Sequence, residues 1–356
     1  MRIFIDIGHP AHVHYFRNFI IEMQKHGHEF SITARNKEVS HLLLRNYNIP
    51  YFDRGKGADN LTGKALYALK ADNIIYQRAK NFKVDVFLSF ASPYAAHVSR
   101  LLKKPHISFT DSENARLGIL SFSPFTDCIL TPKSFKGCFG SKQVIFNGFM
   151  ELCYLHPKYF RLNQKIKSEL GLAENEKYAL LRFVSWKANH DIGQSGIPDN
   201  MKIKLVRNLE KKLKVFISSE SKIPEALIKN RIQIAPEKIH DVLGMATIYI
   251  GEGATMASES AMLGTPSIYV NSLTAGTIEE QQNYGLLFSY RNFNGVLSKV
   301  EELLDYPDLK KDFMQKRIEM LNSQIDVTSF MVWFVENYPK SFRIMRERPE
   351  YEDNFK

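Results

Sequence analysis

Short runs of β-branched and aromatic residues alternate along this chain with longer segments in which apolar residues recur at helical spacing. The first half predicts strands at residues 2–8, 29–35, 84–90, 106–111, 127–132 and 144–148. The second half predicts strands at residues 178–186, 214–219, 231–236, 246–251 and 266–271. Helical periodicity falls between most of them, as in residues 15–27, where Gly27 is the expected C-cap. This alternation indicates βα units and parallel sheets.

The βα pattern breaks at residues 152–165 and then restarts. We therefore expect an α/β protein of two Rossmann-like, doubly wound domains, 1–155 and 165–325, that face a central cleft. Residues 326–338 predict one more helix, with Asp326 as its N-cap, in a C-terminal segment, 326–356, that can pack back on the first domain. Ligands of such sheets bind at the carboxyl ends of the strands, so the loops there are the candidates for chemistry.

Composition narrows the class of protein. The 356 residues are 44% hydrophobic and 24% charged, as in globular proteins, and no apolar run approaches the roughly 20 residues of a membrane span. The start of the chain predicts a strand rather than a signal peptide, so a cytoplasmic location is expected. Three cysteines without C-x-x-C spacing predict free thiols.

The net charge of +10 predicts an anionic partner. Charge alone does not choose between a nucleotide, a nucleic acid and an anionic membrane. The basic residues are spread along the chain without zinc-finger spacing or an RNP-type motif, so a nucleic acid is not expected. Ordinary solubility is the alternative explanation of the charge.

The stretch GEGATMASES, residues 251–260, joins a predicted strand to a predicted helix. Gly251 and Gly253 let the backbone approach a ligand, and the helix start offers unpaired N–H groups and a positive dipole end. This combination suits a phosphate or pyrophosphate. Ser258 and Glu259 lie one to two turns into the helix, where Glu259 can reach a ribose. The alternative is that the small residues only permit tight packing and that Glu259 is solvated.

The pattern G-A-x-x-x-S-E at 253–259, with L-G-x-P at 263–266 and E-Q-Q-N at 280–283, resembles the donor site of GT-B glycosyltransferases, especially the lipid-II-forming N-acetylglucosaminyltransferase. The resemblance implies roles for six residues. The diphosphate would be held by Gly253, Ala254 and Thr255, the ribose hydroxyls by Glu259, and the donor sugar by Gln281 and Gln282. Ser258, next to Glu259, is a further candidate donor contact.

Three histidines, His9, His12 and His14, crowd the expected turn after the first strand. A histidine at the carboxyl end of a strand can accept a proton from a hydroxyl nucleophile. G-x-x-x-H-V resembles the corresponding loop of the same transferases, which makes His12 the candidate base, although this loop is poorer in glycine and contains Pro10. A histidine satisfied by backbone hydrogen bonds is the alternative. A metal site is not expected, because no carboxylate follows at helical spacing.

Asp111 and Glu113 follow another predicted strand, in FTDSENARLG, residues 109–118. Such a pair of carboxylates can transfer protons. The stretch weakly resembles the Glu-Ala-Gly-Leu-Arg segment of the non-hydrolysing UDP-N-acetylglucosamine 2-epimerases, with Glu113 and Arg116 in place but the glycine missing. An acid bound to backbone amides is the equal alternative.

The loop after the first strand of the second half, RFVSWKANHDIGQSG at 182–196, contributes three more candidates. Trp186 can stack on a base, while Lys187 or Arg182 can neutralise a diphosphate leaving group. Core packing explains Trp186 equally well. The corresponding loop of the transferases is rich in glycine, so the base of the nucleotide stays open.

Almost the whole chain resembles a small prokaryotic family of GT-B-like domains of unknown function, number 354. The shared features are I-D-x-x-x-P-A-H-V-H at 5–14, G-H-x-x-x-x-T-A-R at 27–35 and W-K-A-x-H-D at 186–191. This resemblance implies the GT-B fold more firmly than it implies a reaction.

Residues 121–142 interleave phenylalanines with lysines. The members of this set are Phe122, Phe125, Phe135, Phe139, Lys133, Lys136 and Lys142. If exposed, they would suit an anionic membrane surface and a lipid-linked acceptor. Most of these phenylalanines are expected in the core, so peripheral membrane association, at the inner face, stays an open alternative.

These motifs together predict a metal-independent inverting glycosyltransferase without a cofactor. It would use a nucleotide-diphosphate sugar as donor and a glycan or lipid-linked acceptor, in cell-envelope or polysaccharide synthesis. A nucleotide-sugar 2-epimerase that uses Asp111, Glu113 and a histidine is the alternative. A nucleotide-sugar-binding protein without turnover is the third hypothesis.

Overall fold

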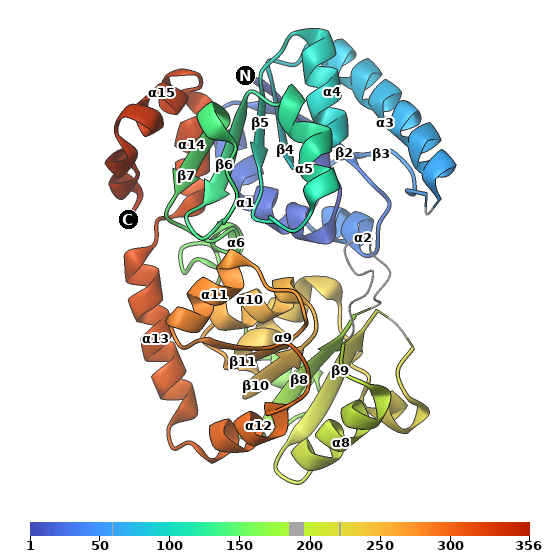
Figure 1. Cartoon of the computed structure of the whole chain (residues 1–356), viewed down its shortest axis with the longest axis vertical. Coiled ribbons are helices and arrows are strands. Elements are labelled where there is room, and N and C mark those ends of the chain that lie inside the picture. The colour runs from blue at the N-terminus through green and yellow to red at the C-terminus, as the bar shows by residue number, and fades with distance from the viewer. Residues whose placement is uncertain (59, 185–195, 221) are drawn as a thin grey trace. The chain divides into compact units, whose positions relative to one another are not determined.

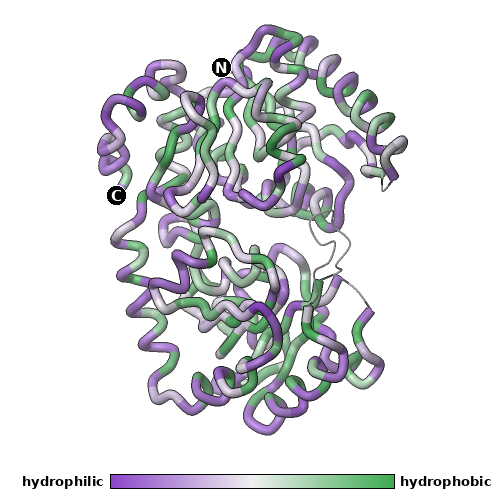
Figure 2. The backbone as a smooth tube through the Cα atoms, viewed as in Figure 1, coloured by the Kyte–Doolittle hydropathy of each residue, from purple (hydrophilic) through white to green (hydrophobic). Residues whose placement is uncertain are grey.

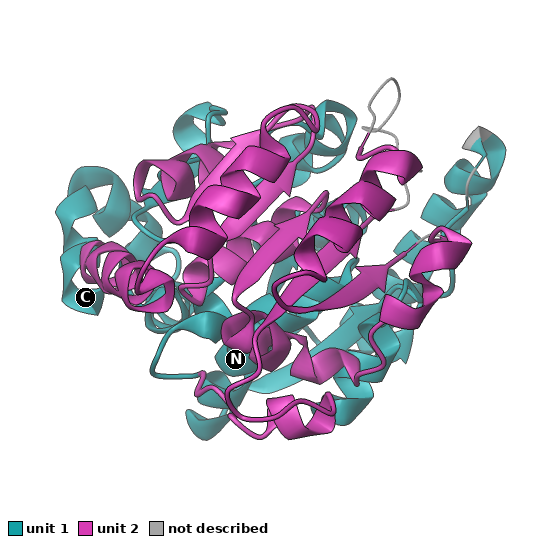
Figure 3. Ribbon diagram, turned by 90° about the horizontal axis from the view of Figure 1, so that it is seen from below, with its two compact units in different colours: residues 1–159, 324–356 teal, residues 160–323 magenta. Residues whose placement is uncertain are grey.

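The computed structural model describes residues 1–58, 60–184, 196–220 and 222–356, with the backbone alone at Leu61. The chain forms two compact α/β units (Figures 1 and 3). Unit 1 comprises Met1–Tyr159 and Gln324–Lys356, and unit 2 comprises Phe160–Ser323. The C-terminal segment of the chain is thus part of unit 1.

Seven parallel strands form the sheet of unit 1 in its described residues, in the order β3-β2-β1-β4-β5-β6-β7. Their bounds are β1 (Arg2–Ile7), β2 (Glu29–Ala34), β3 (Phe52–Asp53), β4 (Val86–Phe90), β5 (His106–Phe109), β6 (Cys128–Pro132) and β7 (Gln143–Phe146). Every residue of β4 and β6 is buried, as expected when helices cover both faces of a parallel sheet.

The helices of unit 1 form two groups. Their bounds are α1 (Pro10–Lys25), α2 (Ser40–Asn46), α3 (Leu61–Phe82), α4 (Pro93–Leu102), α5 (Arg116–Phe122), α6 (Leu152–Leu155), α14 (Val327–Glu336) and α15 (Lys340–Glu347). Helix α4 packs against α3 and α5, whereas α1 packs against α2, α6 and α14. The right-handed crossovers of a doubly wound sheet place two such groups on opposite faces.

Helix α1 begins five residues before the predicted start at residue 15. Pro10 occupies its first turn, where its fixed φ suits a helix, and the His9 side chain accepts a hydrogen bond from the Ala11 N–H as N-cap. The prediction that His12 lies in a turn before the helix is therefore wrong, because His12 belongs to the first turn of α1.

Five parallel strands form the sheet of unit 2 among its described residues, in the order β12-β11-β10-β8-β9. Their bounds are β8 (Tyr178–Phe183), β9 (Lys214–Ser219), β10 (Ile248–Gly251), β11 (Ser267–Val270) and β12 (Leu287–Tyr290). The helices are α7 (Ile166–Glu169), α8 (Asp199–Leu209), α9 (Ile239–Met245), α10 (Ala254–Met262), α11 (Gly276–Asn283), α12 (Val296–Asp305) and α13 (Leu309–Ser323).

The strand predicted at 231–236 does not form in this part of the structure. Arg231 makes an isolated parallel bridge to Ile217, and a short 3₁₀ turn follows at Pro236–Lys238. Pro236 has no N–H group to donate to a neighbouring strand. The segment would also lie at the edge of the sheet, and some of its positions are polar. The edge strands β3 and β12, in contrast, were missed by the sequence pattern: β3 has only two residues, and three of the four residues of β12 are only half-buried.

The core of each unit follows its sheet, and much of the hydrophobic colouring in Figure 2 lies along the strands. The predicted last helix is confirmed as α14, with the Asp326 carboxylate accepting from the Ser329 N–H. Phe330 and Phe334 of α14 are fully buried in unit 1. The predicted free thiols are also confirmed, with Cys128 and Cys153 buried and Cys138 exposed.

Candidate functional site

The strand order reverses once in each sheet. In unit 1 the reversal lies between β1 and β4, and in unit 2 it lies between β8 and β10. Doubly wound sheets bind their ligands at the carboxyl ends of the strands at such a point. The segments that follow these four strands are therefore the candidate sites, one in each unit.

A buried carboxylate lies at the carboxyl end of β1 in unit 1. Asp6 is fully buried, and its Oδ1 accepts from Thr33 Oγ1 and Arg54 Nε, both at 2.8 Å. Its Oδ2 accepts from Arg54 Nη2 at 3.2 Å and from Ser92 Oγ at 2.5 Å. Ser92 is also the N-cap of α4, so Asp6 links the end of β1 to β2, to the loop after β3 and to the start of α4.

Arg54, 2% exposed, is enclosed by two tyrosines. Its Nη1 donates to the Tyr67 hydroxyl, and its guanidinium carbon lies 4.8 Å from the ring centroid of Tyr94. Burial alone would lower the pKa of Arg54, but Asp6 and then the two tyrosines outweigh it and raise that pKa. Arg54 thus stays a cation that is already paired.

His12 points to the same region of unit 1. Its ring lies 4.9 Å from the ring of Phe90, and its Nδ1 accepts from the Gly8 N–H at 3.3 Å. Burial, followed by the charges of His9, Lys37 and Arg54, holds the pKa of His12 well below its ordinary value. The ring is therefore neutral near pH 7, and an accepting Nδ1 places its proton on Nε2.

Asp111 and Glu113 follow β5, which β4 separates from β1. With neighbouring strands about 5 Å apart, their loop begins on the order of 10 Å from the end of β1. Burial raises the pKa of Asp111 to about 6, against a hydrogen bond from Ser112 that lowers it. Asp111 therefore titrates close to neutrality.

In unit 2, the turn after β10 has the expected form. Gly253 is the N-cap of α10, and its lack of a side chain leaves the first N–H groups of the helix without a side-chain cap. Ala254 is exposed and Thr255 is half-buried. A Cβ at Gly251 would lie 2.2 Å from the Tyr249 hydroxyl, so packing against Tyr249 is by itself a reason for glycine at this position.

Glu259 and Ser258 are buried inside α10 rather than solvated. The Glu259 carboxylate pairs with His240 of α9 at 3.0 Å, and each side chain is 5% exposed. Ser258 Oγ accepts from Gln281 Nε2 at 2.5 Å. Gln282, the next residue, is exposed, and its Oε1 accepts from the Ser289 N–H. The two glutamines thus point in different directions.

Arg182 is engaged at the end of β8. Its guanidinium donates to Ser218 Oγ at 2.7 Å and pairs with Glu220. Trp186 and Lys187, the other candidates of this loop, lie outside the residues that the structure describes.

Glu252 has a role that sequence reasoning missed. Its buried carboxylate accepts the Val184 N–H at 2.9 Å and the Ile197 N–H at 2.6 Å. One side chain at the end of β10 therefore holds two backbone positions that flank the loop after β8.

The sequence pattern also did not identify Asp6, Arg54 and His240 as residues of the candidate sites. A charged residue inside an apolar strand is the signal that would have found Asp6.

Most phenylalanines of the segment 121–142 lie in the core, as expected. Phe122 is 0% and Phe135 8% exposed, Phe139 is half-buried, and Phe125 is 40% exposed. Phe135 and Phe139 stack on each other with ring centroids 5.5 Å apart. Peripheral membrane association stays a prediction.

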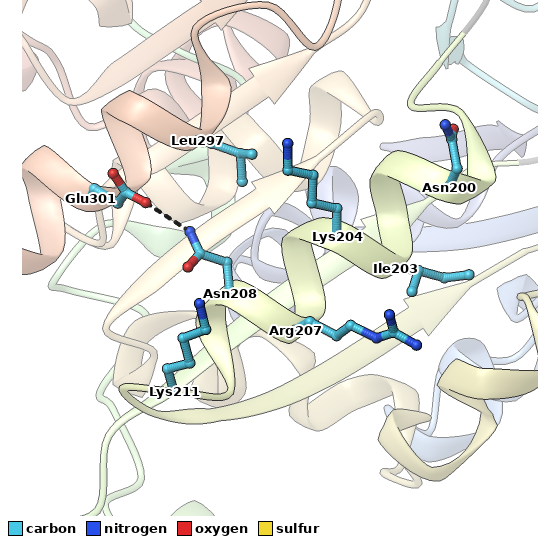
Figure 4. Close-up of a pocket in the computed structure, with 8 residues that line it drawn as sticks. All are labelled: Asn200, Ile203, Lys204, Arg207, Asn208, Lys211, Leu297 and Glu301. Atoms are coloured by element: carbon cyan, nitrogen blue, oxygen red, sulfur yellow. Dashed lines mark hydrogen bonds between the residues drawn. The ribbon is translucent and has the colours of Figure 1, made fainter.

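A surface groove of about 460 Å³ lies between α8 and α12 of unit 2 (Figure 4). Lys204, Arg207 and Lys211 line it, and Asn208 donates to Glu301 across it at 3.0 Å. The groove is built from helix side chains, away from the carboxyl ends of the strands, and we assign it no part in the site.

No group of three or more histidine, cysteine or carboxylate side chains in the described ranges is placed to hold a metal ion. No helix within the part of the chain that the structure describes is long and apolar enough to cross a membrane.

Residues 1–279 match the family described as "Protein of unknown function (DUF354)". The uncharacterized protein MJ0665 of Methanocaldococcus jannaschii is 24% identical over 277 residues, covering 75% of this chain and 80% of that protein.

Two similar solved structures show the fold. The UDP-GlcNAc 2-epimerase from Neisseria meningitidis bound to UDP-GlcNAc has a TM-score of 0.70 at 14% identity, covering 94% of this chain and 99% of that one. The spinosyn rhamnosyltransferase SpnG, complexed with spinosyn aglycone, has a TM-score of 0.59 at 13% identity, covering 95% and 100%. The expected GT-B fold is confirmed, and the resemblance to both groups of enzymes holds at the level of the fold.

Proposed function

Because the chain belongs to the DUF354 family of proteins of unknown function, whose description assigns no activity, we propose a function from the two sites: a metal-independent inverting glycosyltransferase that uses a nucleotide-diphosphate sugar. The observation that carries the proposal is the start of α10. A glycine N-cap without a side chain leaves backbone N–H groups and the positive helix end open to an anion at the switch point of unit 2.

Unit 2 binds the donor in this proposal. The N–H groups from Gly253 to Thr255 hold the diphosphate, and Glu259 binds ribose hydroxyls after exchanging its hydrogen bond with His240. The further donor contacts that we propose are Ser258, Gln281, Gln282, Arg182, Trp186 and Lys187. UDP-GlcNAc, the ligand of one structural neighbour, is the first donor to test.

Unit 1 supplies the proton transfer. His12 takes the proton of an acceptor hydroxyl, the oxygen attacks the anomeric carbon, and the bond from that carbon to the diphosphate breaks with inversion. The electron pair leaves with the diphosphate, whose charge the start of α10 stabilises. His12 is neutral, as a base must be, but its proton has to move from Nε2 to Nδ1, which breaks the 3.3 Å bond from Gly8.

The acceptor in this proposal is a glycan or lipid-linked sugar of the cell envelope or a polysaccharide. The reaction would take place in the cytoplasm, at a membrane surface if the acceptor is lipid-linked. The charged sugar nucleotide is the only other reactant, so the proposal includes no cofactor.

Donor binding is tested by adding a negative charge at the start of α10. Ala254→Asp should stabilise the helix slightly yet weaken UDP or UDP-GlcNAc binding about tenfold or more, because the carboxylate repels the diphosphate. Gln315→Glu adds the same charge on the exposed face of α13 and should leave binding unchanged. Calorimetric titration measures both. Equal Kd values for Ala254→Asp and the unsubstituted chain would remove the donor site from α10.

The base is tested at His12. His12→Ala should cut transfer to an acceptor about 100-fold or more while donor affinity stays within about twofold, because His12 belongs to the acceptor step. Unchanged turnover in this variant would assign the base elsewhere. Donor binding by the unsubstituted chain without any turnover would support a binding protein instead.

A 2-epimerase is the second candidate, and Asp111 is the observation that favours it. A carboxyl with a pKa of about 6 can both take and return a proton near neutrality. The epimerase predicts inversion at C2 of the donor sugar without an acceptor, which NMR of the incubated donor detects. Asp111→Asn should abolish that reaction, and a transferase should not show it.

A further inference from the structure

The proposed function leaves the segment Thr33-Ala34-Arg35 without an assigned ligand. Thr33 is used within the Asp6 network, whereas Arg35, the first residue after β2, lies outside it. The Arg35 backbone N–H is bonded to the carbonyl of Ile7, the last residue of β1. Arg35 therefore stands at the carboxyl end of the sheet, beside the strand that leads to His12.

The guanidinium of Arg35 has no polar partner among the described residues. Its Nε is buried without a hydrogen bond, and no carboxylate in the described ranges pairs with it. Its charged carbon lies 6.0 Å from the ring centroid of Tyr67, the tyrosine that also contacts Arg54. A buried donor without an acceptor is costly, so a cation held in this state is suited to an anion that arrives from outside.

Gly57 leaves room for this guanidinium. A Cβ at Gly57 would lie 2.0 Å from Arg35 Nη2, so any larger residue would displace the cation. The absence of a side chain at position 57 therefore allows Arg35 to lie against the loop after β3. In Arg54, by comparison, each of the three guanidinium nitrogens already donates to Asp6 or Tyr67, and Asp6 neutralises its charge.

The charges around this edge favour an anion. The lowered pKa of His12 has contributions from His9, Lys37 and Arg54, which shows a positive potential at the carboxyl end of β1. The nearby carboxylates are occupied, since Asp6 pairs with Arg54 and Glu38 with Lys37. Arg35 is a cation at this edge for which the described residues supply no carboxylate partner.

We propose that Arg35 binds a phosphate group of the second substrate at the carboxyl ends of β1 and β2. A guanidinium offers paired N–H donors that match two oxygens of a phosphate. Lys37, although paired with Glu38 at 3.4 Å, is a second cation at this edge. The assignment to the second substrate rests on the proposed function, in which unit 1 receives the acceptor. The acceptor would then be a sugar phosphate or a phosphate-linked lipid.

The test uses the full chain and two probes, inorganic phosphate and UDP, at constant ionic strength. Phosphate should raise the melting temperature of the unsubstituted protein by about 2–4 °C at saturating concentrations. Arg35→Gln should lose this rise, with an about tenfold or greater increase in the phosphate Kd. The matched control Arg100→Gln, an exposed arginine of α4, should keep it. Salting effects of phosphate act equally on all variants and cancel in this comparison.

Further variants separate the possible failures. Arg35→Lys keeps the charge without the paired donors and should show an intermediate rise in melting temperature with phosphate. If Arg35→Gln does not fold, Lys37→Gln replaces it in the test and should weaken phosphate binding. Ala254→Asp should lose the UDP rise and keep the phosphate rise, while Arg35→Gln should do the reverse.

The outcomes are decisive in each direction. No phosphate effect on the unsubstituted chain, or the same effect in Arg35→Gln, overturns the site. Loss of both rises in Arg35→Gln assigns Arg35 to the donor and overturns the second-substrate assignment. A phosphate rise that depends on Arg35, without any UDP rise, keeps the phosphate site while the proposed transferase fails.

Discussion

At the scale of single residues, Asp6 and Arg54 form a buried ion pair in unit 1. Asp6→Asn should destabilise the protein by about 3 kcal/mol, because it leaves the buried Arg54 cation without its counter-charge. Arg54→Met should cost a similar amount, and the double variant should cost clearly less than the sum. Chemical denaturation measures all three. Asp53→Asn, at an exposed carboxylate near by, should stay within about 0.5 kcal/mol.

Substitution of Asp111, unlike that of Asp6, should stabilise the protein. Its folded pKa of about 6 lies above its ordinary 3.8, so ionisation costs stability as pH rises through this window, and the cost is complete at pH 7. Asp111→Asn should therefore stabilise the protein at pH 7, by only about 1 kcal/mol because solvent screens this half-buried group. Below pH 4 the substitution should leave the stability unchanged. Unfolding free energies at pH 4 and 7 check it. A gain of equal size at both pH values would contradict the raised pKa.

The sequence could predict only part of the candidate site. The glycine turn at 251–253 and the helix of Glu259 follow from spacing, and both are where they were expected. The partners are not predictable, because His240 lies 19 positions from Glu259 and Arg54 lies 48 from Asp6. Such pairs are set by how strands and helices pack, and no local pattern reports that.

At the scale of elements, His97 joins three helices of unit 1. Its Nδ1 pairs with Asp72 of α3 at 3.1 Å, and its Nε2 lies 3.2 Å from the Ser121 carbonyl of α5. The hydrogen bond with Asp72 raises the pKa of His97, so the protonated ring, with two donors, stabilises this contact. This stability is present in full below about pH 6.5 and is lost as pH rises through the folded pKa.

Amide exchange of α5 should report this loss. After correction for the intrinsic rate, protection of residues 116–122 should fall about two- to fivefold between pH 6 and pH 8, because the pair is half-exposed and screened. His97→Gln should show low protection at both pH values. Full protection of α5 at pH 8 in the unsubstituted chain would show that the charge of His97 plays no part.

The central strands were predicted well because they are buried on both faces. Residues 127–132 contain β6, every residue of which is buried, and such an apolar run in a parallel sheet is recognisable without its partners. The edge strand β9 also matches its predicted range, 214–219. The errors are at edges and ends. Residues 231–236 are apolar enough for a strand but lie at the edge, whereas α1 begins early because Pro10 and His9 fix its first turn.

At the scale of the whole molecule, chain order and unit membership differ. Residues 324–356 follow unit 2 in sequence, yet they belong to unit 1, where α14 packs on α1 and α6. Asn18 of α1 and Thr328 of α14 both donate to the carbonyl of Cys153 in α6. The first unit is therefore built from two stretches of chain that unit 2 separates in the sequence.

This arrangement predicts where a distant substitution acts. Phe330→Ala should cost about 3–5 kcal/mol by leaving a cavity, and the loss of amide protection should fall on the strands of unit 1, although the residue follows unit 2 in the chain. Phe313→Ala, at an equally buried ring in α13, is the reciprocal control and should weaken the strands of unit 2. Exchange measured strand by strand separates the two patterns. If Phe330→Ala lowered protection of β8–β12 as much as that of β1–β7, α14 would not be a part of unit 1 alone, because a compact unit confines the effect of its own cavities.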